Sequence, residues 1–398
     1  MTVTPAPQRG TRPANRRALI VAAATELFFV RGYEHVAMGD IAEAVAVGPS
    51  ALYRHFASKQ LLLEEVVLHG LGVVRDVVEA LDPGDPHRSL RSLTDLTVQN
   101  RHIGILVERE ARHLSPAAHA RVRAGVLDLA RRAAGAVETL RPDLHADARD
   151  LAAWMTLGVV VSPSFHQSDL TAGEQAALLA DLSSRIIGAA FPADLAIGPP
   201  VAEPVGLEPR SRREALLQKA IELFAEGRYA GVGIEDVAAA LGMAGPSVYN
   251  HFSSKTELLA TALFRGAGFL YMQVADVLAV SSHAAEALRG LIASYVEFAL
   301  THPALVDILI TEVRNLPESD REAALAAQRD YIAEWVHLVC QSQPQLPESA
   351  ARLQVHAVLT LVNYVARVRH LRSATNVRAV VVSVCQHLLG VSAHESRA

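Results

Sequence analysis

The sequence has only two cysteines, few aromatic residues and no apolar run long enough to span a membrane. Cys340 and Cys385 are too few for a disulfide scaffold, and such sparse cysteine is typical of a reducing compartment. Residues 377–389 are apolar but too short for a span, and Gln386 and His387 interrupt them. The arginines near the N-terminus are not followed by an apolar core, so no signal peptide is predicted. We therefore expect a cytoplasmic protein without a membrane partner.

A strong basic charge, a metal motif and a catalytic motif are also missing. The net charge of −5 does not indicate nucleic-acid binding, although an acidic body with locally basic segments would still bind DNA. The 17 histidines include no i, i+4 pair and no Cys/His ligand spacing, so neither a metal nor a cofactor is predicted. No set of nucleophile, base and orienting group is visible, which makes a helical enzyme the least favoured hypothesis.

The sequence does contain an internal repeat. Residues 40–59 recur as residues 236–255, and each residue of the second copy lies 196 positions after its counterpart, as Tyr249 lies after Tyr53. No gap is needed to align the two copies. A period of this size indicates a duplicated domain, because the units of solenoids are only tens of residues long.

Each copy has the pattern of three short helices. In the first copy, apolar spacing and turn residues predict helices over residues 16–30, 38–45 and 49–56. The second and third helices are separated by a very short turn at residues 46–47. Two short helices joined in this way form a helix-turn-helix, whose second helix enters the major groove of DNA.

The end of each copy resembles a known signature. The segments ALYRHFASK at residues 51–59 and SVYNHFSSK at residues 247–255 resemble the DNA-binding signature of TetR/AcrR-type regulators. The resemblance implies an all-α protein made of three-helix DNA-binding heads and helical ligand-binding bodies that work as dimers. The chain is similar to tandem members of that family, with two complete units in one polypeptide.

The repeat and the proline-rich stretches predict the order of segments. We expect a disordered basic arm (1–15), a first helix-turn-helix domain (16–60), a first helical regulatory body (61–191), a proline-rich linker (192–209), a second helix-turn-helix domain (210–256) and a second body (257–391). In the first unit we expect a long connecting helix over 59–81 and body helices over 88–113, 116–140, 147–166 and 172–190. In the second we expect helices over 255–280, 283–301, 303–315, 318–341, 346–371 and 375–390.

The third helix of each head is expected to contact DNA. Arg54 matches the O6 and N7 acceptors of guanine, whereas its counterpart Asn250 matches adenine, so the two heads should read different half-sites. Tyrosine, histidine and lysine of the signature are interpreted as phosphate contacts. The helix cap is expected at Gly48 in the first copy and one residue later, at Gly245, in the second. The predicted DNA-binding residues are Ser50, Ala51, Tyr53, Arg54, His55 and Lys59, and Pro246, Ser247, Tyr249, Asn250, His251 and Lys255.

One position departs from the family pattern. The family usually has a hydroxyl residue that caps the second helix of the head and meets phosphate, and Ala37 and Gly233 stand there. Loss of such a cap typically costs about 1 kcal/mol for alanine and less for glycine. The departure concerns the strength of DNA binding and leaves the predicted fold unchanged.

The bodies carry the predicted effector and pairing sites. A small apolar effector is expected among the aromatic residues of the second body, with plain core packing as the alternative. The candidates are Tyr295, Phe298, Tyr331, Trp335, His356 and Tyr364. The resemblance also implies that the last two helices of a body form the dimer interface, with Trp154, Leu157, Leu179, Leu182 and Ile186 available in the first body.

These observations predict a transcriptional repressor that binds a double-stranded DNA operator and is released by the effector. The two units are expected to pair within one chain as a pseudo-dimer, and a homodimer of two chains remains open. An alternative is that one head no longer binds DNA and serves only as a dimerisation partner.

Overall fold

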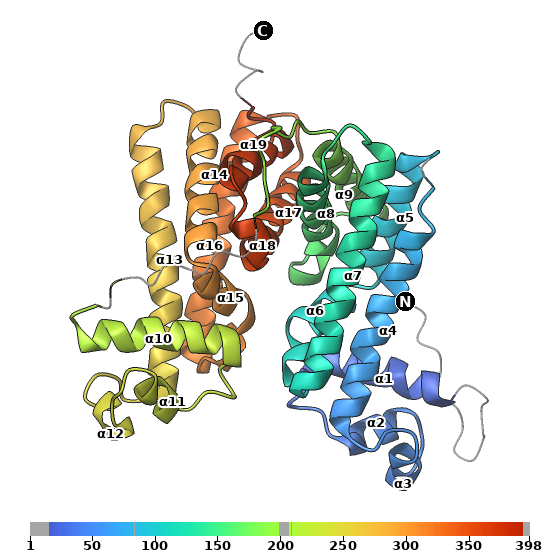
Figure 1. Cartoon of the computed structure of the whole chain (residues 1–398), viewed down its shortest axis with the longest axis vertical. Coiled ribbons are helices and arrows are strands. Elements are labelled where there is room, and N and C mark those ends of the chain that lie inside the picture. The colour runs from blue at the N-terminus through green and yellow to red at the C-terminus, as the bar shows by residue number, and fades with distance from the viewer. Residues whose placement is uncertain (1–15, 83, 199–206, 208, 393–398) are drawn as a thin grey trace. The chain divides into compact units, whose positions relative to one another are not determined.

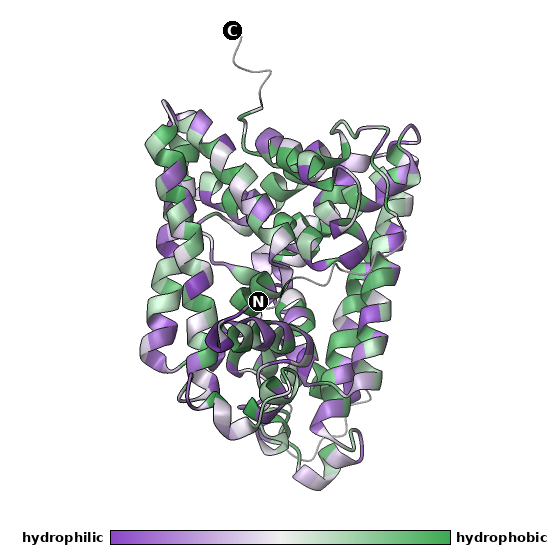
Figure 2. Cartoon of the chain, turned by 60° about the vertical axis from the view of Figure 1, so that its left-hand side comes forward, coloured by the Kyte–Doolittle hydropathy of each residue, from purple (hydrophilic) through white to green (hydrophobic). Residues whose placement is uncertain are grey.

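The computed structural model describes residues 16–82, 84–198, 207 and 209–392 (Figure 1). These residues form helices joined by short loops and contain no strand. The predicted arm over residues 1–15 and much of the predicted linker lie outside the described residues. Hydrophobic and hydrophilic residues alternate along the helices, as expected of helices with one buried face (Figure 2).

The first head consists of α1 (Arg16–Arg31), α2 (Met38–Ala44) and α3 (Pro49–Tyr53). Ile20, Ala24 and Phe28 recur at helical spacing on α1 and are fully buried. Gly32 ends this helix with a φ of +80°, a backbone conformation that favours glycine. The predicted third helix was too long, because α3 ends at Tyr53, three residues before the expected end.

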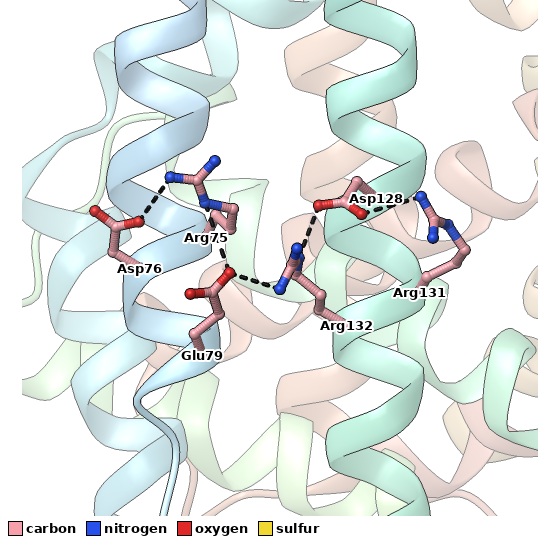
Figure 3. A network of polar contacts seen from close by, with 6 residues as sticks. All are labelled: Arg75, Asp76, Glu79, Asp128, Arg131 and Arg132. Carbon is pink, nitrogen blue, oxygen red and sulfur yellow. Dashed lines mark hydrogen bonds and ion pairs between the residues drawn. The ribbon is translucent and has the colours of Figure 1, made fainter.

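The first body begins with α4 (Lys59–Glu79) and includes α7 (Pro116–Leu140), which packs along it. Exposed ion pairs link the two helices, including one of 2.6 Å between Arg132 Nη1 and Glu79 Oε1 (Figure 3). Such exposed pairs contribute little to stability. The buried apolar side chains of both helices, such as Leu62 and Val122, therefore provide most of the packing energy.

The predicted single helix over residues 88–113 was wrong. This stretch forms α5 (Pro86–Gln99), α6 (His102–Glu108) and the 3₁₀ turn η1 (Glu110–His113). Asn100 interrupts it with a φ of −118° and a ψ of 48°, and its side-chain Nδ2 donates to the carbonyl of Leu96 at 2.8 Å. The Leu96 carbonyl also accepts the backbone N–H of Asn100 at 2.9 Å, so the side chain adds a second hydrogen bond to the last turn of α5.

The second head and body repeat this order. The head consists of α10 (Arg212–Gly227), α11 (Ile234–Ala239) and α12 (Gly245–Val248). The body consists of α13 (Lys255–Val280), α14 (Ala284–Thr301), α15 (Pro303–Thr311), η3 (Val313–Asn315), α16 (Glu318–Ser342), α17 (Glu348–Arg367), α18 (Arg369–Arg372) and α19 (Val377–Leu388). The helix predicted over residues 346–371 is divided into α17 and α18 at Val368.

Helix α13 is long and apolar enough to cross a membrane by length and composition, and the bent pair α14–α15 passes the same test as one broken span. The expectation that no apolar run reaches this length was therefore wrong. Length and composition are weak evidence for a span, and α13 packs against α10, α14, α15 and α16. We describe it as a packing helix of the second unit.

The last two helices of the first half pack with the second half of the chain. The chain forms two compact units, and the second unit includes residues 141–160 and everything after residue 167. Within it, α9 (Ala172–Ile187) contacts α17 and α19. Helix α8 (Ala146–Val161) crosses α17 so closely that a Cβ on Gly158 would lie 2.8 Å from Cα of Leu361.

Polar contacts also cross this seam, by which we mean the packing of α8 and α9 against α17 to α19. Arg185 Nη1 on α9 donates to the carbonyl of Leu388 at 3.2 Å. His370 Nε2 lies 2.8 Å from an oxygen of Asp150. The residues predicted for pairing lie on α8 and α9 and are all buried, namely Trp154, Leu157, Leu179, Leu182 and Ile186.

Candidate nucleic-acid interface

The first candidate recognition helix, α3, is anchored on one face and open on the other. Gly48 is its N-cap and Pro49 its first residue, where the missing N–H needs no partner. Leu52 is fully buried and holds the helix to the head. The predicted DNA-binding residues Ser50, Tyr53, Arg54 and His55 are exposed, and Ala51 is half-buried.

The second candidate helix, α12, follows the same register. Its N-cap is Ala244, which aligns with Gly48, so the expected displacement of the cap to Gly245 was wrong. Proline fits either of the first two helical positions, because neither N–H has a partner within the helix. Moving the proline by one residue therefore leaves the cap in place. Pro246, Tyr249 and Asn250 are exposed, Ser247 and His251 are half-buried, and Val248 is the buried anchor.

The turn between the two helices of each motif needs a left-handed residue. Gly242 has a φ of +64° in the second head, and Ala46 has a φ of +54° at the aligned position of the first head. Glycine adopts this conformation without strain, whereas alanine does so at a cost. The first head therefore keeps the turn despite an unfavourable residue.

The caps of α2 and α11 have no side-chain oxygen, as the sequence predicts. Ala37 and Gly233 are the N-caps, and neither makes a side-chain cap hydrogen bond. Their backbone N–H groups instead donate to Asp40 and Asp236, each at 2.7 Å. Half of a capping box thus remains in both heads, while the hydroxyl that would meet phosphate is absent.

The signature lysines are half-buried and bind backbone carbonyls of the heads. Lys59 Nζ donates to the carbonyls of Tyr33 and Val36 at 2.8 and 2.9 Å, and it lies 4.1 Å from the centre of the Tyr33 ring. Lys255 makes the same two bonds to the aligned carbonyls of Tyr229 and Val232. Burial lowers the pKa of both lysines. These half-buried lysines therefore hold the loop between the first two helices of each head, and their contact with phosphate stays a prediction.

Two arginines outside the predicted set of DNA-binding residues support the recognition helices. The guanidinium of Arg17 lies 4.7 Å from the centre of the Phe56 ring, and that of Arg213 lies 4.3 Å from the centre of the Phe252 ring. Each phenylalanine is buried just after its recognition helix. Cation–π contacts of this kind favour one position of the helix end. The repeat could have indicated this role, because Arg17 and Arg213 occupy aligned positions of the two heads.

The aromatic candidates for the effector site divide into two groups. The rings of Tyr295, Phe298, Tyr331 and Trp335 contact one another, with centroids 6.0 Å apart for Tyr295 and Trp335. All four are buried, and burial raises the pKa of Tyr295 to about 12. His356 and Tyr364 are half-buried on α17. The tilted and edge-to-face contacts are those of a packed core, so the geometry favours the core alternative for the four rings.

The fold thus defines a class, namely helical proteins that carry two helix-turn-helix heads and two bodies in one chain. Residues 20–66 and 216–262 both match the family model "Bacterial regulatory proteins, tetR family", and residues 281–367 match the model "Tetracyclin repressor-like, C-terminal domain". The chain belongs to the TetR family and carries its DNA-binding domain twice. Because this is a family of regulators, the hypothesis of a helical enzyme is dropped.

Individual relatives match parts of the chain. The transcriptional repressor KstR2 of Mycobacterium tuberculosis is 31% identical over 111 residues, which are 28% of this chain and 56% of the relative. The transcriptional regulator TcmR of Streptomyces glaucescens is 45% identical over 58 residues, or 15% of this chain and 24% of the relative. The chain therefore spans little more than half the length of KstR2 and about a quarter of the length of TcmR. A TetR-family regulator from Bordetella parapertussis has a similar solved structure, with a TM-score of 0.42 and 20% identity over 48% of this chain and 99% of that one.

Proposed function

We propose that the protein is a DNA-binding transcriptional repressor with two non-identical reading heads. The observation that carries this proposal is the pair of recognition helices, α3 and α12. They have the same register and one buried anchor each, but the first head exposes Arg54 where the second exposes Asn250. The family membership supports DNA binding, and the name of KstR2 supports repression.

The exposed residues have distinct proposed roles. Arg54 donates to O6 and N7 of a guanine, and Asn250 pairs with an adenine edge. Tyr53 and His55 in the first head contact phosphates and fix the docking, as do their counterparts in the second. Ser50, Ala51, Pro246 and Ser247 line the surface that faces the groove. An operator read in this way has two different half-sites.

The two heads act from one polypeptide in this proposal. The seam formed by α8 and α9 with α17 to α19 lies within one chain and takes the place of a dimer interface. It buries Trp154, Leu179 and other apolar side chains, as a permanent interface does. Both heads would then enter major grooves about 34–36 Å apart, or a multiple of that distance, on one face of the duplex.

An effector would act on this complex from a body. A small apolar molecule that binds a body better in the DNA-free state weakens operator affinity, with a typical coupling of about 1–3 kcal/mol. Because the four aromatic rings pack as core, the proposed place is beside the half-buried His356 and Tyr364 of α17, which provide polar groups. A regulator of this kind works where the DNA is, so we expect it in the cytoplasm.

The test is operator selection from random duplexes with the purified full-length chain, followed by footprinting of the selected sequence. We expect two dissimilar half-sites. Arg54→Ala should weaken protection of one half-site and leave contacts at the other intact. Equal weakening of both halves would contradict the asymmetric assignment, and no selected sequence at all would contradict DNA recognition.

A second variant separates the alternative in which one head only supports pairing. Asn250→Ala and Tyr249→Ala remove exposed side chains of α12 without touching its buried anchor. If the second head reads DNA, each change weakens protection of the other half-site. Unchanged affinity in both variants would favour the alternative that this head does not bind DNA.

A further inference from the structure

Each unit buries one glutamate at the junction between its body and its head. Glu110 begins η1 and is 5% exposed, and Glu312 follows α15 and is 4% exposed. Glutamate is almost never this buried unless its carboxylate is held by specific partners. The two bodies differ widely in sequence, yet both place a glutamate where a short helix meets the 3₁₀ turn that follows it. These elements are α6 and η1 in the first body and α15 and η3 in the second.

In the first unit the carboxylate is bound to the head. Glu110 Oε2 accepts the backbone N–H of Tyr33 at 2.8 Å, across 77 residues of sequence. Tyr33 lies in the loop of residues 32–37 between α1 and α2, which we call the first head loop. Its ring stacks on His113 of η1 with centroids 4.9 Å apart. Because Lys59 of α4 holds two carbonyls of the same loop, the loop is held from both sides.

In the second unit Glu312 occupies the corresponding place. Its carboxylate accepts Asn315 Nδ2 at 2.6 Å, which fixes its orientation on η3. The Lys255 ammonium that holds Tyr229 and Val232 is within electrostatic reach of this carboxylate, which opposes the lowering of the Lys255 pKa by burial. Residues 228–233, the second head loop, are held by the two hydrogen bonds of Lys255, and the place of the buried Glu312 before η3 corresponds to that of Glu110 in η1.

The head loops lead directly to the recognition helices. The first head loop ends at Ala37, the N-cap of α2, and α2 packs against α3. Ala111 and Leu114 beside Glu110 also share one hydrophobic cluster with Phe28, Ile41 and Leu52 of the head. A displacement of η1 therefore moves polar and apolar contacts of the head together.

We propose that Glu110 and Glu312 are positioning residues for DNA recognition, through which each body holds its own head loop and passes a displacement of its 3₁₀ turn to the recognition helix. This inference rests on the proposed function, because it assigns the route by which a body controls its head. A buried carboxylate suits such a role, since leaving it or its N–H partner unsatisfied is far more costly than the bond is stabilising. The contact is therefore either made or replaced by a different arrangement.

The first test is hydrogen exchange of the full-length protein without DNA. Glu110→Ala should increase amide exchange in residues 33–41 by about tenfold or more, the ratio expected for the loss of one charged hydrogen bond. Exchange in α5 and in the outer half of α7 should be unchanged. Glu110→Gln keeps an acceptor oxygen at the same reach and should behave nearly as the wild type. Glu138→Ala on the exposed face of α7 is the matched control.

Two results of that test would overturn the proposal. One is unchanged exchange of the first head loop in Glu110→Ala. The other is a uniform increase over the whole first unit, which would mean that the glutamate stabilises the fold without controlling the head. Glu312→Ala should act in the same way on residues 228–240 and leave the first head unchanged.

The second test uses the operator selected by the wild-type protein. Glu110→Ala should raise the protein concentration needed to protect the half-site read by Arg54 at least tenfold. Glu312→Ala should have the same effect at the other half-site. Loss at both half-sites in either variant would contradict the assignment of one glutamate to one head. If the wild-type protein selects no operator, the proposed function fails, while the exchange experiment still decides whether the glutamates hold the head loops.

Discussion

A substitution at Gly158 tests the packing of α8 against α17 most directly. A Cβ at this position would lie 2.8 Å from Cα of Leu361 and 3.3 Å from its backbone nitrogen. Both atoms belong to the backbone of α17, so no flexible side chain can move aside. Gly158→Ala therefore requires α8 and α17 to separate.

The expected magnitude follows from two opposing terms. Alanine is favoured over glycine in a helix interior by about 1 kcal/mol. Overpacking of a tight contact costs about 1–3 kcal/mol. We therefore expect Gly158→Ala to leave stability unchanged at best and to lower it by about 2 kcal/mol at most. Gly268→Ala is the matched control in the same unit, because it lies in the interior of α13 with nothing within 4 Å of its Cβ.

Thermal unfolding followed by calorimetry, with each variant compared with the wild type, is the assay. Gly268→Ala should raise the transition of the second unit by a few degrees, at about 2–4 °C per kcal/mol for a unit of this size. Gly158→Ala should lower that transition or leave it in place. If Gly158→Ala raises the transition temperature as much as the control does, α8 does not cross α17 at this point. That result would contradict the packing described for the seam.

Three further perturbations test other parts of the structure. Asn250→Arg should shift the preference of the second half-site from adenine toward guanine by about 1–3 kcal/mol, measured by repeating the operator selection, and an unchanged sequence preference would count against a base contact at this position. Ala46→Gly should stabilise the first head by about 1 kcal/mol in hydrogen exchange, because it removes a left-handed alanine, whereas slower folding or lower stability would show that the turn is not strained. Burial lowers the pKa of His166 from 6.5 to about 4. Between these two pH values, His166 is protonated in the unfolded state and neutral in the folded state. The first unit should therefore lose about 3 kcal/mol of stability as pH falls through this window, with His166→Gln reducing the loss, and an equal slope in that variant would contradict the assignment.

Helical periodicity and the repeat were enough to predict most elements of the fold. The bounds predicted for α7 and α13 agree with the structure because long amphipathic segments that begin at a proline or after a serine N-cap give strong local signals. The interruption at Asn100 was missed, since asparagine within an apolar pattern does not by itself end a helix. The cap of α12 was misplaced because proline is equally acceptable at two successive positions.

The candidate site was predictable only where residue type and exposure agree. Arg54, Tyr53 and their counterparts are exposed on α3 and α12, as the pattern indicates. The roles of Lys59 and Lys255 could not be predicted, because the carbonyls that hold them lie more than twenty residues away in sequence. For the same reason the contact of Glu110 with Tyr33 was invisible, since periodicity identifies a buried face of a helix but not the partner that covers it.

The central claim is that one chain carries two heads to one operator. The most direct measurement is the mass of the complex between the full-length protein and its selected operator, determined by light scattering or native mass spectrometry. We expect one chain of 42.7 kDa for each operator with two dissimilar half-sites. Two chains on each operator, with each chain protecting only one half-site, would contradict the proposal that one chain binds through both heads.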